Sequence, residues 1–168
     1  MSKFRNWSLL AATLTGDGPT GKGRRPRGVP LVLVLSAAEA TRLRPRSARG
    51  VIVSIRDPGT PPIGLNSRWS DVLRVEIPDL SVDGRSDPTP ESLSTTACAI
   101  ADFVHAHRGA PVIAFHCHAG VSRSRTVASV VCEYYGWPYE WYALHYALKG
   151  ALVRAIANGS TRGSGSAE

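Results

Sequence analysis

Two residues of the chain, Cys117 and Arg123, are of types that could together carry out chemistry on a bound anion. They lie in the stretch 116–124, which reads His-Cys-His-Ala-Gly-Val-Ser-Arg-Ser. A cysteine thiolate is a nucleophile, and nearby positive charge or oriented N–H groups lower the pKa of its thiol. An arginine guanidinium is a planar fork that matches two oxygens of a phosphate. The pair therefore predicts a site at which sulfur attacks a phosphate held beside it.

The segments on either side of this stretch predict how the site is built. Residues 111–115 are an apolar, strand-like run, and residues 126–135 have the pattern of a helix. A strand that turns through a short loop into a helix presents unpaired N–H donors, and the helix dipole favours negative charge there. We expect Gly120 to give this loop a backbone conformation that is closed to most residues. The predicted phosphate-binding residues are His118, Ala119, Gly120, Val121, Ser122 and Arg123.

The order His-Cys-x5-Arg-Ser resembles the signature of the cysteine-dependent protein tyrosine phosphatase superfamily. The form with Ala119 and Gly120 is most similar to the dual-specificity branch and its compact bacterial relatives. The resemblance implies that Cys117 forms a cysteinyl-phosphate intermediate, and that Ser124 donates a hydrogen bond to the sulfur and assists breakdown of that intermediate. It also implies that His116 supports the loop and the thiol pKa through hydrogen bonds, and that no metal and no cofactor take part.

The same resemblance implies a general acid that protonates the leaving group, an aspartate on the loop after the strand that precedes the long helix. Three aspartates follow the strand predicted over 72–77, namely Asp79, Asp83 and Asp87. Counting backward from the cysteine favours Asp87, whereas aligning the strand favours Asp79. Because insertions fall in loops, we take Asp79 as the acid. Asp57 precedes a proline in a predicted tight turn, and we expect it to be structural.

Composition narrows the class of protein. The 168 residues are 43% hydrophobic and 20% charged, which is typical of one globular domain. No apolar run approaches the roughly 20 residues that span a bilayer. Three widely spaced cysteines do not make a disulfide framework, so we expect a cytoplasmic protein. The net charge of +7 comes largely from arginine clusters without interleaved aromatic residues, so nucleic acid is not the expected partner.

The apolar pattern along the chain predicts strands that alternate with helices. We expect strands over 31–35, 51–55, 72–77 and 111–115, and helices over 37–43, 89–107, 126–136, 138–148 and 151–157. This order predicts an α/β fold, with a small, largely parallel sheet of four strands, or five, flanked by helices. The predicted divisions are a partly flexible N-terminal arm over 1–30, a phosphatase domain over 31–158 and a flexible tail over 159–168. Cys98 and Cys132, and the aromatic residues Trp137, Trp141, Tyr142 and Tyr146, are expected in the core.

The expected activity is that of a phosphoric monoester hydrolase acting on phosphotyrosine, with phosphoserine and phosphothreonine as further candidates. The expected partner is a phosphorylated protein, and the expected state is a monomer. One alternative is a phosphatase acting on a non-protein ester, such as a phosphoinositide, a nucleotide or an RNA 5′ end. The loop contains His118 and no lysine, whereas lipid-specific relatives carry loop lysines, which argues against the phosphoinositide. The other alternative is a phosphate-binding module with weak turnover.

Overall fold

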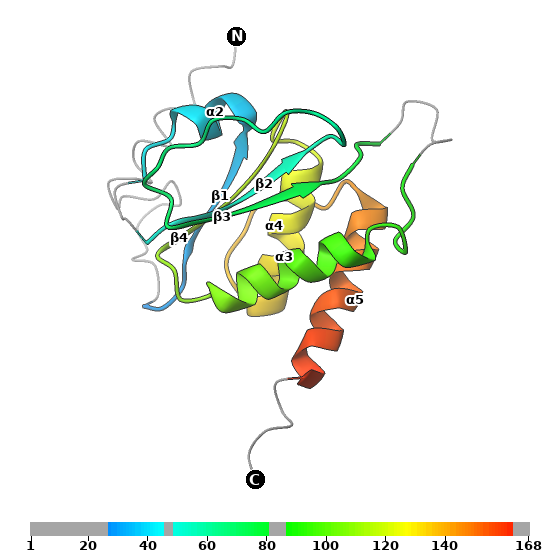
Figure 1. Cartoon of the computed structure of the whole chain (residues 1–168). Coiled ribbons are helices and arrows are strands. Elements are labelled where there is room, and N and C mark those ends of the chain that lie inside the picture. The colour runs from blue at the N-terminus through cyan, green and yellow to red at the C-terminus, as the bar shows by residue number, and fades with distance from the viewer. Residues whose placement is uncertain (1–26, 46–48, 81–86, 163–168) are drawn as a thin grey trace.

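A parallel four-stranded sheet lies at the centre of the protein (Figure 1). The computed structural model describes residues 27–45, 49–80 and 87–162. The strands are β1 (Leu31–Ser36), β2 (Val51–Arg56), β3 (Asp71–Glu76) and β4 (Val112–Cys117), in the spatial order β1-β4-β2-β3. Every neighbouring pair is parallel. The predicted α/β class, with a parallel sheet of four strands, is confirmed.

The strand sequences explain their places in the sheet. Strand β2 reads Val-Ile-Val-Ser-Ile-Arg, and its first five residues are buried. Such continuous apolar runs are typical of parallel strands covered on both faces. Strand β3 lies at the edge and reads Asp-Val-Leu-Arg-Val-Glu, with its three charged residues exposed. Charged side chains on an edge strand disfavour pairing with another chain.

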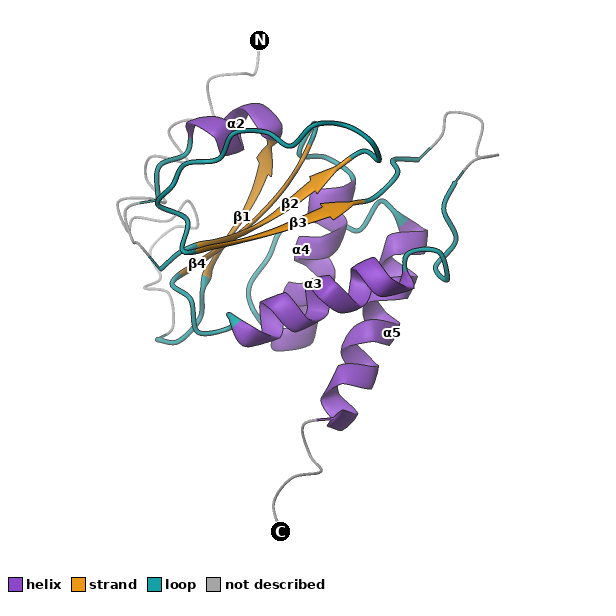
Figure 2. Cartoon of the chain, in the orientation of Figure 1, coloured by secondary structure: helices purple, strands orange, loops and turns teal. Residues whose placement is uncertain are grey.

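Helices cover the two faces of the sheet unequally. Three helices, α3 (Ser94–Ala106), α4 (Arg123–Tyr135) and α5 (Tyr146–Arg162), lie on one side (Figure 2). Together with the sheet they bury the larger hydrophobic cluster, which includes Phe115. The short helix α2 (Ala37–Arg42) lies beside the end of β1, and the smaller cluster on that face includes Trp69. Within the described residues, no helix is long and apolar enough to cross a membrane.

The carboxyl ends of the four strands meet at one edge of the sheet. Ser36, the last residue of β1, is level with Cys117, the last residue of β4. Arg56 at the end of β2 is level with Glu76 at the end of β3. The segments that follow all four strands therefore converge. In open parallel sheets, this edge is where ligand sites lie.

Three predicted helices, over 89–107, 138–148 and 151–157, differ in extent or number from those of the structure. The segment 89–93 forms a turn, in which Thr89 Oγ1 accepts a hydrogen bond from the Ser92 N–H, and the regular helix α3 begins at Ser94. The two closing helices are one helix, α5, which starts at Tyr146 after an irregular segment over 137–145.

The two ends of the chain also differ from the predicted divisions or lie outside the described residues. Helix α5 extends to Arg162, past the start of the predicted tail. Residues 1–26 of the predicted arm, and residues 163–168, lie outside the described residues.

Candidate active site

Cys117 is the last residue of β4 and is only 2% exposed. Burial would raise the pKa of its thiol, but hydrogen bonds outweigh burial and leave that pKa lowered. The donors are the Ser124 hydroxyl, 3.2 Å from Sγ, and the backbone N–H groups of Ser124, Gly120 and Val121. Hydrogen bonds to the charged form of an acid favour that form. The loop that follows Cys117 thus stabilises a thiolate.

The phosphate loop, residues 117–123, is braced by the corner between β1 and α2. Gly120 has a φ of 71°, in the left-handed region that favours glycine. A Cβ at this position would lie 2.7 Å from the Ser36 backbone nitrogen and 2.8 Å from the Leu35 carbonyl carbon. The N–H of Ala37 donates to the His118 carbonyl, at 3.0 Å. The expectation that Gly120 permits a special backbone conformation is confirmed, and the close approach of β1 is a second reason for glycine.

The corner itself is fixed by a capping box at the start of α2. The Ser36 hydroxyl accepts a hydrogen bond from the Glu39 N–H, and the Glu39 carboxylate accepts one from the Ser36 N–H. This reciprocal pair satisfies donors that the helix start would otherwise leave free. The loop therefore rests against a rigid surface.

Arg123, the first residue of α4, is 1% exposed and points into a ring of acceptors. One terminal nitrogen, Nη1, donates to Asp57 Oδ1 at 2.8 Å and to the Ile77 carbonyl at 2.7 Å. The other, Nη2, donates to Asp79 Oδ2 at 3.1 Å. The Nε donor has no hydrogen-bond partner within the described part of the chain. The guanidinium is thus held firmly in place with one buried donor available to an anion.

Asp79 and Asp87, two of the three candidate acids, lie in different surroundings. Asp79 contacts Arg123, so the structure brings it to the phosphate loop. Asp87 is exposed, eight residues further along the chain, and Asp83 lies outside the described residues. Aligning the strand led to the residue that reaches Arg123, whereas the backward count did not. The role of Asp79 as the acid stays a prediction.

The sequence interpretation missed the part that Asp57 plays at the site. The tight turn expected there is present, since the Thr60 N–H donates to the Asp57 carbonyl at 3.2 Å. The Asp57 carboxylate, however, forms an ion pair with Arg123, at 2.8 Å. A signal was available, because Asp57 directly follows a strand of a parallel sheet, and such strand ends converge. Asp57 is both a turn residue and a partner of the arginine.

His116 directly precedes Cys117 in β4, is 2% exposed, and contacts the neighbouring strand β2. Its Nε2 lies 2.8 Å from the Ser54 hydroxyl oxygen, and the two residues are level in the pairing of β2 with β4. Burial lowers the pKa of its imidazole to about 4; a backbone hydrogen bond with Cys117 opposes this, and the charge of Arg74 adds to it. The ring is therefore neutral near pH 7. The neutral, hydrogen-bonded ring is consistent with the supporting role that the resemblance implies, and that role stays a prediction.

The other cysteines and two aromatic residues differ in part from what the sequence predicts. Cys132 is fully buried, as expected, and burial raises the pKa of its thiol to about 12. Cys98 is exposed, so it is not the core residue that its helical spacing indicates. Tyr142 and Tyr146 are 83% and 77% exposed and are likewise not in the core. They are solvent-facing because the segment before α5 is irregular rather than helical, which breaks the spacing used to place them.

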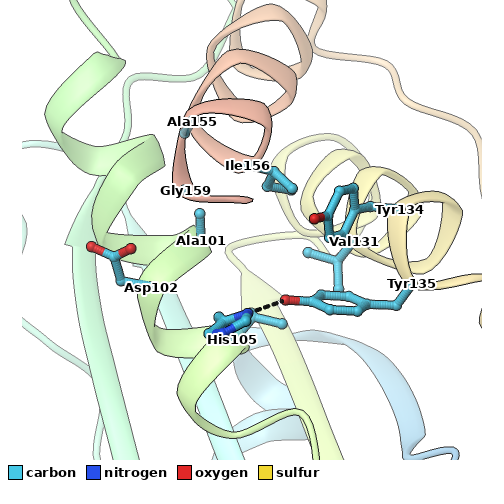
Figure 3. Close-up of a pocket in the computed structure, with 10 residues that line it drawn as sticks. Ala101, Asp102, His105, Val131, Tyr134, Tyr135, Ala155, Ile156 and Gly159 are labelled. Atoms are coloured by element: carbon cyan, nitrogen blue, oxygen red, sulfur yellow. Dashed lines mark hydrogen bonds between the residues drawn. The ribbon is translucent and has the colours of Figure 1, made fainter. Parts of the chain in front are cut away.

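A cavity between α3, α4 and α5 lies away from the phosphate loop (Figure 3). It is lined by Ala101, Asp102 and His105 of α3, by Tyr134 and Tyr135 near the end of α4, and by Ile156 of α5, among others. Its volume is about 60 Å³. Ligand pockets in proteins have volumes of roughly 300–1,000 Å³. This cavity is too small for a substrate, and the reactive groups lie at the other end of α4.

Comparisons with known proteins found similar structures but no similar sequence. No family model matches the chain, and no curated protein matches it. The structure of human DUSP28 is similar at 17% identity, covers 81% of this chain and 98% of that one, and has a TM-score of 0.44. The structure of Tk-PTP in the active form is similar at 21% identity, covers 77% and 80%, and has a TM-score of 0.38.

Proposed function

We propose that this protein is a phosphatase that hydrolyses phosphotyrosine in proteins, with phosphoserine and phosphothreonine as further substrates, through a cysteinyl-phosphate intermediate. The observation that carries the proposal is the set of hydrogen bonds to the buried sulfur of Cys117, which lowers the pKa of its thiol. A thiolate held among loop N–H groups, six residues before a buried arginine, suits attack on a tetrahedral anion.

In the first step, the Cys117 thiolate attacks phosphorus, and the bond from phosphorus to the ester oxygen breaks. Arg123 and the N–H groups of the phosphate loop bind the non-bridging oxygens and stabilise charge in the transition state. Asp79 gives its proton to the departing oxygen, which leaves as an alcohol or phenol. The products of this step are the free alcohol, the Asp79 carboxylate and a phosphate bound to sulfur.

In the second step, water attacks the phosphorus of the intermediate, and the bond from sulfur to phosphorus breaks. The Asp79 carboxylate takes a proton from the water, which returns the acid to its starting form. The Ser124 hydroxyl, 3.2 Å from Sγ, donates a hydrogen bond to the departing thiolate. Inorganic phosphate leaves, and the sulfur is again a thiolate.

The test is a parallel assay of the purified chain on a phosphotyrosine peptide, a phosphoserine peptide, a soluble phosphoinositide and a nucleoside monophosphate, with released phosphate as the readout. We expect turnover of the phosphotyrosine peptide to be fastest, and rapid quenching with acid to trap phosphate on Cys117. Preference for the phosphoinositide or the nucleotide would replace the proposed substrate. Phosphate release without a trapped intermediate, or by Cys117→Ser, would overturn the mechanism.

A further inference from the structure

His145 is a fully buried histidine that is not part of the phosphate loop. It lies in the irregular segment just before α5 and is 0% exposed. Its ring nevertheless contacts the acid loop, residues 77–80, because Nε2 lies 3.2 Å from the Pro78 carbonyl oxygen. That carbonyl belongs to the peptide unit that continues into Asp79.

The hydrogen bonds around His145 fix which ring nitrogen carries the hydrogen. The backbone N–H of Leu148 donates to Nδ1, at 3.3 Å, so Nδ1 is an acceptor. A neutral imidazole has one donor and one acceptor, so Nε2 carries the hydrogen and donates to Pro78. A buried ring with both nitrogens bonded in this way is fixed in orientation as well as in tautomer.

The backbone of His145 is tied to the phosphate loop through Thr126 of α4. The Thr126 hydroxyl accepts hydrogen bonds from the N–H groups of Leu144 and His145, both at 3.0 Å. The same hydroxyl donates to the carbonyl of Ser122 in the phosphate loop, at 2.9 Å. A hydroxyl has one hydrogen and two lone pairs, so this arrangement uses its full capacity. The chain of contacts runs from Ser122 through Thr126 and His145 to Pro78.

We propose that His145 is a positioning residue for the general acid, holding the loop that carries Asp79 at a fixed distance from the phosphate loop. The proposal rests on the proposed function, in which Asp79 protonates the leaving group. The Asp79 side chain is 48% exposed, and its loop follows an edge strand. The loop therefore needs hydrogen bonds from the protein interior to keep Asp79 in position. The two carbonyls that precede Asp79 both accept hydrogen bonds, that of Ile77 from Arg123 and that of Pro78 from His145.

Two substitutions separate the ring contact with Pro78 from packing. In His145→Gln the amide can donate from a position close to that of Nε2, so the anchor is kept. In His145→Asn the shorter side chain can still accept from Leu148 but does not reach Pro78. Tyr146→Ala, which alters the exposed neighbour, is the control for the start of α5.

The readout is kcat/KM on two aryl phosphates, one with a poor leaving group (phenyl phosphate) and one with a good leaving group (4-nitrophenyl phosphate). This constant covers the steps up to the phosphate bound to sulfur, in which only the poor leaving group needs the acid, and leaves out the later attack of water, in which Asp79 acts alike for both substrates. We expect His145→Asn to lower kcat/KM about tenfold more on the poor substrate than on the good one, as the loss of one hydrogen bond would. His145→Gln and Tyr146→Ala should leave the ratio near that of the wild type. In an Asp79→Asn background, His145→Asn should add little on either substrate.

An equal fall on both substrates, or a full additional loss in the Asp79→Asn background, would overturn the proposal and make His145 merely structural. If the wild type hydrolyses neither phosphate, it is the proposed function that fails. A second measurement uses the unaltered protein, in which imidazole ¹⁵N shifts and couplings report the tautomer. Hydrogen on Nε2 is expected, and hydrogen on Nδ1 would remove the donor to Pro78 and contradict the proposal even if a variant fails to fold.

Discussion

Two buried cysteines near the two ends of α4 differ in the pKa of their thiols. Cys117, six residues before the helix starts, has a lowered thiol pKa, while Cys132, near the end of the helix, has a thiol pKa raised to about 12. They are 2% and 0% exposed, so burial does not distinguish them. The difference lies in their partners. Cys117 accepts hydrogen bonds from loop and helix N–H groups and from Ser124, whereas burial is the cause of the raised pKa of Cys132.

Burial alone would make a cysteine inert, and oriented donors make it reactive. Burial disfavours a thiolate, and hydrogen bonds to the sulfur favour it. The N-terminal end of a helix supplies free N–H groups, and the C-terminal end supplies carbonyls. At the far end of α4, the N–H groups of Gly136 and Trp137 donate to the Glu133 and Cys132 carbonyls, and the pKa of the Cys132 thiol is raised by burial.

The largest expected effect on activity comes from replacing Cys117, and replacing Cys132 tests the difference between the two cysteines. Cys117→Ser should lower turnover of an aryl phosphate on the order of 10³-fold or more, because the alcohol is a far weaker nucleophile at neutral pH. Cys132→Ala should retain most of the activity. Peptide mapping after iodoacetate treatment should find Cys117 modified first, with vanadate slowing it, and Cys132 unmodified in the folded protein. Comparable labelling of both cysteines would mean that the hydrogen bonds around Cys117 do not make it reactive.

The next largest effect concerns the arginine at the start of α4. Arg123→Lys keeps the charge but loses the planar fork, so we expect kcat/KM to fall about 10²-fold or more. Arg154→Lys is the matched control, because Arg154 also pairs with a carboxylate, Glu91 at 3.2 Å, but on the exposed surface of α5. It should leave kcat/KM unchanged. Equal losses in both variants would point to a general charge effect rather than to phosphate binding.

Much of the fold and of the candidate site could be predicted from the sequence, because the patterns that indicate them lie in neighbouring residues. The apolar runs that became β1, β2 and β4 and the loop that starts at Cys117 are each read from neighbouring residues. The pairing of Cys117 with Ser124, seven residues on, is implied by the resemblance that the stretch 116–124 carries. Asp79 was found by aligning a strand, which also uses local pattern.

The features that the sequence did not predict depend on contacts between distant residues. The segment 137–145 has helical aromatic spacing, yet the N–H groups of Leu144 and His145 bond to Thr126, 18 and 19 residues away. That competing partner draws them away from a helical ladder. The contact of Asp57 with Arg123 joins residues 66 apart, and only the order of strands in the sheet predicts it. His145 carried no motif at all, and its bond to Pro78 also requires the folded arrangement.

A third prediction uses pH to test the buried support behind Cys117. The pKa of His116 is lowered to about 4 in the folded protein and is near 6.5 when unfolded. Between these values the unfolded chain binds more protons, so stability falls as the pH falls from about 6.5 to 4. We expect this histidine to contribute a loss of about 2 kcal/mol in the free energy of unfolding between pH 7 and 4.5. Urea unfolding of the wild type and of His116→Gln at both pH values isolates the contribution of His116, since the other titrating groups are present in both proteins. An equal change of the free energy of unfolding with pH in the two proteins would mean that His116 has the same pKa in the folded and unfolded states.

The smallest expected effect separates the two left-handed glycines that flank α4. Gly120 and Gly136 have φ values of 71° and 65°, so alanine is strained at both, by about 1 kcal/mol. At Gly136 nothing lies within 4 Å of an added Cβ, whereas at Gly120 the backbone of β1 lies within 2.9 Å.

We therefore expect Gly136→Ala to lower the free energy of unfolding by about that strain alone, with unchanged kcat. Gly120→Ala should lose more stability, and about tenfold in kcat, because the loop must move away from β1 and carries its N–H groups with it. Thermal unfolding and kcat on 4-nitrophenyl phosphate measure both quantities. An equal fall of kcat in Gly136→Ala and Gly120→Ala would contradict this expectation. It would mean that activity depends on both ends of α4, and not on the contact between the phosphate loop and β1 alone.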